Sequence, residues 1–209
     1  MIVWLASYPH SGNTFLRVLV KKYFKVPTYS IYNDILMVED EKMGHITGQE
    51  HLDHSQLGKL RARNRVYFVK THQLLDDFSQ MYAEGDIVLY IVRDGRAVAL
   101  SYVDYIGTLY GDTVSFRALV NGEYTPFGRW ADHISLWGES PFITRTLYFE
   151  KIIKDQSETA REIADLCGFP FQERPFIPFK SLHKANPAFF ASGKTDRWKA
   201  LSGEDHRYF

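Results

Sequence analysis

The sequence contains a single cysteine, Cys167, among its 209 residues. One cysteine excludes a disulfide within the chain and any metal site built from several thiolates, and it is typical of a reducing compartment. The sequence also lacks an apolar run of 18 residues and, at its N-terminus, the basic and apolar regions of a secretory signal. We therefore expect a cytoplasmic protein without a membrane segment, in which Cys167 is a buried thiol at a helix end.

The sequence also has no excess of positive or negative charge, since Lys plus Arg and Asp plus Glu both number 25. Without a global basic field, neither nucleic acid nor an anionic membrane is expected as the main partner. The histidines at 45, 51 and 54 have no helical spacing that would assemble a metal site. The 45% hydrophobic content is enough for one large core. We expect a single domain over residues 1–209, and the sequence predicts no particular oligomeric state.

Apolar runs and helical spacings alternate along most of the chain. Strands are expected at 2–6, 66–69, 86–92 and 143–149, and helices after residue 12 and at 97–110, 127–137 and 157–167. This order predicts an α/β fold: a three-layer domain with a central parallel sheet flanked by helices. Residues 25–64 show no clear period, 111–126 favour a loop or short helix, and the proline-rich last forty residues disfavour long regular helices.

The polar loop between the first strand and the first helix is the clearest candidate binding site. Residues 7–12 read SYPHSG, and Ser11, Asn13 and Thr14 supply side-chain donors next to the positive end of a helix dipole. Such a loop binds phosphate or sulfate through backbone N–H groups. The alternative is an ordinary strand-to-helix connection that is capped by Ser11 or Asn13.

Three later segments carry polar residues in positions that could meet this loop. Lys70 and His72 stand at the carboxyl end of the second strand, the edge that faces ligands in open α/β sheets. Arg93 follows the third strand and precedes Ser101 by eight positions, so both could reach one anion; the alternative is a surface arginine and a capped helix. Residues 193–199, GKTDRWK, suggest a flexible anion clamp, with a solvated surface loop as the alternative.

Together these segments resemble the cytosolic-type sulfotransferases, which use 3′-phosphoadenosine 5′-phosphosulfate (PAPS) as sulfuryl donor. Residues 8–15, YPHSGNTF, resemble the family's 5′-phosphosulfate loop, usually Tyr-Pro-Lys-Ser-Gly-Thr-Thr-Trp, and residues 70–72 match its Lys-Thr-His. Arg93 with Ser101 is similar to the family's 3′-phosphate site. Residues 147–152 and 193–199 resemble its Arg-Tyr-Glu-Asp-Leu and terminal Arg-Lys-Gly-x-x-Gly-x-Trp-Lys segments. The resemblance covers nearly the whole chain.

The resemblance implies a P-loop-like α/β domain and an activity. The activity is sulfuryl transfer from PAPS to a hydroxyl, phenol or amine of a small-molecule acceptor, leaving adenosine 3′,5′-bisphosphate, without a metal. It implies that His72 is the catalytic base and that Lys70 and His10 contact the transferring group. The residues that it implies for cofactor binding are Ser11, Gly12, Asn13, Thr14, Phe15, Arg93, Ser101, Gly193, Lys194 and Arg197.

Three departures from the family pattern keep other functions open. His10 replaces the loop lysine, Phe15 replaces the tryptophan that stacks on adenine, and Ala191-Ser192 replace the Arg-Lys pair before Gly193. One alternative is therefore a homologue that binds the nucleotide but transfers slowly or not at all. Another is an ATP- and Mg²⁺-dependent phosphotransferase, disfavoured because Asn13 stands where a Walker loop needs its lysine. Residues 25–64 and 103–126 are expected to line the acceptor pocket, whose acceptor the sequence does not identify.

Overall fold

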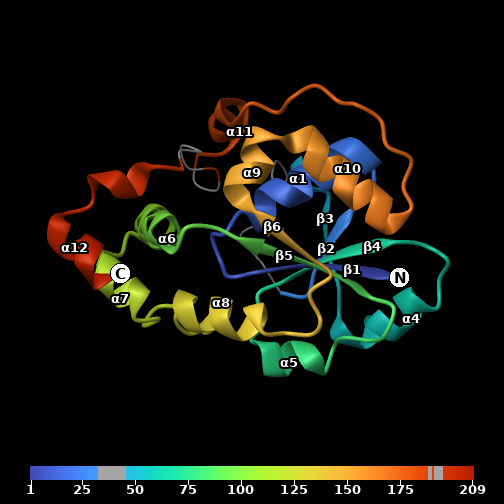
Figure 1. The fold of residues 1–209 in the computed structure, drawn as a ribbon, viewed down its shortest axis with the longest axis horizontal. Helices are drawn as coiled ribbons and strands as arrows, with labels where there is room; N and C mark the ends of the chain where they lie inside the picture. Colours follow the sequence, from blue (N-terminus) through green and yellow to red (C-terminus); the bar gives the residue numbers. More distant parts are fainter. Residues whose placement is uncertain (33–45, 188–189, 191–194) are drawn as a thin grey trace.

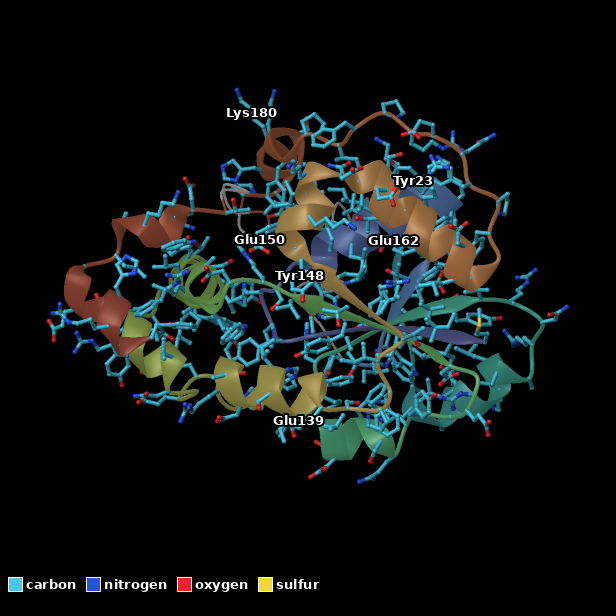
Figure 2. The ribbon with its side chains drawn as sticks, viewed as in Figure 1. Tyr23, Glu139, Tyr148, Glu150, Glu162 and Lys180 are labelled. Atoms are coloured by element: carbon cyan, nitrogen blue, oxygen red, sulfur yellow. The ribbon has the colours of Figure 1, made fainter. Side chains whose placement is uncertain are left out.

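A six-stranded parallel sheet forms the centre of the computed structural model, which describes residues 1–32, 46–187, 190 and 195–209. In those ranges the strand order is β3-β2-β4-β1-β5-β6, and each neighbouring pair is parallel (Figure 1). The strands are β1 (Ile2–Ser7), β2 (Thr28–Ser30), β3 (Gln49–His51), β4 (Tyr67–Thr71), β5 (Ile87–Val92) and β6 (Arg145–Tyr148). The predicted parallel sheet is confirmed.

Helices lie on both faces of the sheet and beyond one end of it (Figure 1). Their bounds are α1 (Asn13–Phe24), η1 (His54–Gln56), α4 (Leu57–Arg61), α5 (Leu75–Ser79), α6 (Gly95–Tyr110), α7 (Phe116–Val120), α8 (Trp130–Gly138), α9 (Phe149–Lys154), α10 (Gln156–Cys167), α11 (Phe179–Ala185), η2 (Arg197–Ala200) and α12 (Gly203–Tyr208). Within the described part of the chain, no helix has both the length and the apolar character needed to cross a membrane.

The pleat of β1 divides the core into two layers. Val3 and Leu5 face the apolar cluster formed with α1, α9, α10 and α11, whereas Ile2 and Trp4 face the cluster formed with α4, α5 and α8. All four side chains are fully buried, because successive strand residues point to opposite faces of a sheet that is covered on both sides. Cys167 belongs to the first cluster, as expected of a buried thiol.

A smaller unit built from α6, α7, η2 and α12 lies beyond the sheet, at the left of Figure 1. Its own apolar cluster joins α6 to α7, and Arg117 on α7 forms ion pairs with Glu204 and Asp205 on α12 at 2.8 and 3.0 Å. The guanidinium of Arg96 stacks 3.5 Å from the ring centre of Trp198 on η2. The C-terminal segment is thereby held against α6.

The predicted strands and helices are confirmed with small changes of boundary, and two strands were missed. β2 and β3 fall inside residues 25–64, where each has only three residues and no period can develop. β2 nevertheless lies between β3 and β4 with its Thr28 and Ser30 buried, because its neighbours rather than its own apolar content hold it in the sheet. The predicted loop or short helix at 111–126 contains α7, and the last forty residues form only short helices.

Candidate active site

The loop between β1 and α1 turns sharply at the carboxyl edge of the sheet. His10 and Gly12 both adopt left-handed backbone conformations, with φ of 63° and 106°. The first backbone bond of α1 runs from the Leu16 N–H to the Gly12 carbonyl at 3.1 Å, so the N–H groups of residues 13–15 lie at the open end of the helix. A Cβ on Gly12 would meet the ring of Phe149 at 2.2 Å. The loop is thus packed tightly with its amides available to an anion.

Two buried polar atoms of this loop have no hydrogen-bond partner among the described residues. Ser11 is fully buried, and within that part of the chain neither its Oγ nor the Oδ1 of Asn13 has a partner. The Asn13 amide instead donates to the Leu5 carbonyl at 2.7 Å, and the N-cap, Gly12, has no side chain to cap α1. The alternative of a connection capped by Ser11 or Asn13 is therefore wrong. A buried hydroxyl without a partner costs about 1–3 kcal/mol, which a phosphate or sulfate oxygen would relieve.

His72 follows β4 and points its imidazole toward the loop. Its Nδ1 lies 2.6 Å from the Ser7 carbonyl oxygen, and because a carbonyl only accepts, Nδ1 carries the hydrogen and Nε2 carries the lone pair. Burial, and then the positive charge of Lys70, hold the pKa of His72 well below its ordinary value. The ring is therefore neutral at pH 7, in the tautomer that a general base at Nε2 requires.

Lys70 lies on β4, two residues before His72. It is 7% exposed, and its Nζ lies 5.4 Å from the ring centre of Tyr32. Burial is the largest cause of the lowered pKa of both His72 and His10, and the positive charge of Lys70 is a further cause. The structure thus brings the ammonium group close to the two imidazoles that flank the loop.

The side chain of His10 lies among aromatic rings of α6. Its ring centre is 4.3 Å from that of Tyr102 and 4.9 Å from that of Tyr105. Burial lowers the pKa of His10 to about 3, with the positive charges of Arg93 and Lys70 as further causes. The imidazole is therefore uncharged at neutral pH and offers a single N–H donor where the family has a lysine.

Arg93 begins the segment between β5 and α6, and it contacts the loop directly. The side chain is 8% exposed, its Nη1 donates to the His10 carbonyl at 3.0 Å, and its guanidinium lies 4.5 Å from the ring centre of Phe149. Its Nε is buried and has no hydrogen-bond partner in the part of the chain that the structure describes. Burial lowers the pKa of Arg93 to about 10, so it remains a cation at neutral pH with an unused donor.

Arg197 approaches the same region from η2. Burial is the largest cause of the lowered pKa of Arg93, and the positive charge of Arg197 lowers it further. The two guanidinium groups are therefore close enough to repel each other. Arg197 Nη1 is paired with Asp104 Oδ2 on α6 at 2.5 Å. Ser101 is half-buried one turn before Asp104, on the same side of α6. Arg197 thus lies close to Arg93 and is paired with α6 one turn beyond Ser101.

The remaining predicted site residues have varied positions. Thr14 is half-buried in the first turn of α1. Phe15 is 2% exposed and packs against Phe149 and Phe179 in the core, so stacking on adenine would require these neighbours to move, and that role stays a prediction. Gly193 and Lys194 lie outside the described residues, as does His45. Among the residues that are described, no group of three His, Cys, Asp or Glu side chains could hold a metal.

Several residues around His72 were missed by the sequence reasoning. The hydroxyl of Tyr32 accepts a hydrogen bond from the His72 backbone N–H at 2.6 Å, and the rings of Tyr32 and Phe127 lie 5.8 and 5.7 Å from its imidazole. Tyr32 falls in the stretch without period, so nothing marked it. His133, which contacts the His72 carbonyl, did carry a signal: it lies four residues before Trp137 on the predicted apolar face of a helix.

Comparison with known proteins identifies the family of this chain. The Sulfotransferase domain family matches residues 2–195. Sulfotransferase 1E1 from Mus musculus is 26% identical over 181 residues, and the human protein of the same name is also 26% identical. Both matches cover 79% of this chain, which spans about 57% of the length of these relatives.

Solved structures share the fold at low sequence identity. Mouse sulfotransferase SULT7A1 complexed with PAP has a TM-score of 0.67 and 16% identity, covering 99% of this chain and 80% of that one. Retinol dehydratase in complex with androsterone and the inactive cofactor PAP has a TM-score of 0.67 and 20% identity, covering 99% and 77%. Since the family match extends over nearly the whole chain, this protein belongs to the sulfotransferase domain family.

Proposed function

We propose that this chain transfers a sulfuryl group from PAPS to a hydroxyl, phenol or amine of a small-molecule acceptor. The observation that carries the proposal is the state of His72: its Nδ1–H is bound to Ser7, and its Nε2 is an unprotonated base beside the anion loop. Membership of the sulfotransferase family supports the same chemistry. Two related structures, retinol dehydratase in complex with androsterone and with retinol, support a small organic acceptor.

The residues present fit a nucleotide with two separate anionic groups, such as PAPS. The buried Ser11 Oγ and Arg93 Nε, both without partners, are donors that phosphate or sulfate oxygens would satisfy. Ser11, the first-turn amides of α1 and Lys70 would hold the 5′-phosphosulfate, and Arg93, Ser101 and Arg197 would hold the 3′-phosphate. PAPS supplies an activated sulfuryl group when bound. The 3′-phosphate takes no part in the transfer and serves to position the nucleotide.

The residues of this chain divide the remaining work between proton transfer and charge stabilisation. His72 Nε2 accepts the proton of the acceptor hydroxyl, while the Ser7 carbonyl holds the opposite ring nitrogen and stabilises the imidazolium that forms. Lys70 stabilises negative charge on the transferring and leaving oxygens. An anionic nucleotide beside the ring favours its charged form, so occupancy should raise the low pKa of His72 toward the working range.

The test is turnover of PAPS with a broad panel of phenols, alcohols and amines. His72→Ala should lower kcat by about 10²–10⁴-fold, the usual contribution of a general base, and leave the affinity for adenosine 3′,5′-bisphosphate within a few fold. His72→Gln, which keeps a donor for the Ser7 carbonyl, should be equally inactive. Turnover retained in His72→Ala would remove this residue from the role of base.

A second candidate function, nucleotide binding with little or no transfer, is favoured by one observation. The pKa of His10, lowered to about 3 by burial and by nearby cations, leaves the loop without the positive charge of the family lysine. If adenosine 3′,5′-bisphosphate binds and no acceptor in the panel yields product, this candidate replaces the first. A thermal shift titration with ATP and Mg²⁺, beside one with adenosine 3′,5′-bisphosphate, tests the phosphotransferase alternative. We expect ATP and Mg²⁺ to raise the Tm of the protein less than the bisphosphate does.

A further inference from the structure

His133, on α8, contacts the main chain of His72. Its side chain is 1% exposed, its Nε2 lies 3.3 Å from the His72 carbonyl oxygen, and its Nδ1 lies 2.8 Å from the hydroxyl oxygen of Tyr90. Because the carbonyl can only accept, Nε2 carries the hydrogen and Nδ1 accepts from Tyr90. One directed chain of hydrogen bonds therefore runs from the Tyr90 hydroxyl through the His133 ring to the peptide group of His72.

This contact matters because His72 lies just beyond the sheet. β4 ends at Thr71, so the main chain of His72 is held by side chains instead of by strand pairing. Its N–H donates to the Tyr32 hydroxyl, and its carbonyl accepts from His133. The following carbonyl, that of Gln73, accepts from the indole of Trp137 at 3.2 Å. α8 thus fixes two consecutive peptide groups at the point where the base leaves the strand.

The surroundings of His133 show what a histidine costs at this position. Its ring lies 5.4 Å from that of Tyr8, 6.0 Å from that of Tyr90 and 6.1 Å from that of Trp137. An apolar side chain would pack among these rings without burying two polar nitrogens. The His72 carbonyl would then lose its partner. In the arrangement observed, both nitrogens of His133 have partners, and the ring joins β5 to the residue after β4.

We propose that His133, whose tautomer is set by the His72 carbonyl and whose Nδ1 is held by Tyr90, is a positioning residue for the His72 base. The proposal rests on the proposed sulfuryl transfer and names a further determinant of its rate. By fixing the peptide group of His72, the bond directs Nε2 toward the acceptor, and a displacement of about 1 Å at a reacting group can cost up to about a hundredfold in rate. His133 does not itself touch the reacting atoms.

The test compares three variants with a matched control. His133→Leu fills the position with an apolar side chain and removes the donor to the His72 carbonyl, so kcat should fall by about ten- to a hundredfold with unchanged affinity for adenosine 3′,5′-bisphosphate. His133→Gln offers an amide donor to the same carbonyl and should restore kcat to within about threefold of the parent. Tyr90→Phe removes a single hydroxyl and should lower kcat by a few fold. This variant replaces His133→Leu as the test if the leucine variant does not fold. Ile134→Val, on the same helix, controls for loss of packing.

A second readout separates this proposal from the function on which it rests. Imidazole ¹H–¹⁵N spectra of the nucleotide-free protein should show His72 as the Nδ1–H tautomer in the parent and in Ile134→Val. In His133→Leu and Tyr90→Phe the less firmly held His72 peptide should weaken the bond from Nδ1 to the Ser7 carbonyl, so the spectra should show a mixture of tautomers. Unchanged spectra in these two variants, or a kcat in His133→Leu within twofold of Ile134→Val, would overturn the positioning role. If the parent itself transfers nothing, the proposed function fails, and the spectra alone decide the role of His133.

Discussion

The guanidinium of Arg93 donates a hydrogen bond from Nη1 to the carbonyl oxygen of His10 at 3.0 Å. This bond joins the end of β5 to the left-handed residue at the centre of the anion loop. A cation assigned to the 3′-phosphate therefore also supports the loop assigned to the 5′-phosphosulfate. The two halves of the proposed nucleotide site share one residue, and loss of that residue should affect both.

Arg93→Ala should weaken the binding of adenosine 3′,5′-bisphosphate by more than tenfold, because charge-assisted hydrogen bonds contribute about 1.5–3 kcal/mol each. Arg93→Lys keeps the charge without the forked donors, so its affinity should lie between those of the parent and the alanine variant. Arg93→Ala should lower the affinity for adenosine 5′-monophosphate, which lacks the 3′-phosphate, by a smaller factor than the affinity for the bisphosphate. Isothermal titration of both nucleotides checks this, and equal affinity in parent and Arg93→Ala would refute the assignment.

His10→Lys should raise both nucleotide affinity and turnover, because it restores a positive charge next to the phosphosulfate loop. The same substitution places a third cation beside Arg93 and Lys70, so the free protein should lose thermal stability. The ligand-induced rise in Tm should therefore be larger in this variant than in the parent. His10→Gln, a neutral donor, is the matched control and should behave like the parent. A lysine variant that neither binds nor turns over PAPS better would show that the loop does not need this charge.

Stability should fall as the pH is lowered below about 6.5. Burial lowers the pKa of His10 to about 3 and of His133 to about 4, and it holds that of His72 well below 6.5. In the unfolded chain these imidazoles return to about 6.5, so the unfolded state binds more protons than the folded state between that value and the lowered ones. Each group then removes up to about 1.4 kcal/mol of unfolding free energy per pH unit.

Urea unfolding at pH 7.5 and pH 5 measures this effect. The parent should unfold at a clearly lower urea concentration at pH 5, and His10→Gln should show a smaller difference because it lacks one of the three buried imidazoles. Equal stability of the parent at the two pH values would contradict the proposed protonation states.

Gly12→Ala should destabilise the fold by about 2–5 kcal/mol. Its φ of 106° is strained for any residue with a side chain, and the new Cβ would lie 2.2 Å from the Phe149 ring. Gly58→Ala is the matched control, since a Cβ there meets nothing within 4 Å inside the helix α4, and it should stabilise by about 1 kcal/mol. Equilibrium urea denaturation compares the two, and similar effects of both substitutions would show that the loop relaxes freely.

Much of the architecture could be predicted from local pattern, because buried strands and amphipathic helices repeat with fixed periods. Residues 86–92 predicted β5, and residues 157–167 predicted α10, which ends where Gly168 adopts φ of 70°. β2 escaped because three residues cannot display a period and its place depends on pairing with β3 and β4. The order of strands in the sheet was likewise not readable, since pairing joins segments far apart in the chain.

In the site, local motifs were enough to identify which chemical groups are available: a polar loop after the first strand, a Lys-Thr-His segment and an arginine after a buried strand. Residue types and spacing suffice to recognise such motifs. The state of those groups depends on the folded structure. Burial and neighbouring cations keep His10 uncharged, the Ser7 carbonyl selects the tautomer of His72, and His133 reaches the His72 peptide from α8. Protonation and orientation depend on distance and solvent exclusion, which folding creates between residues that are remote in sequence.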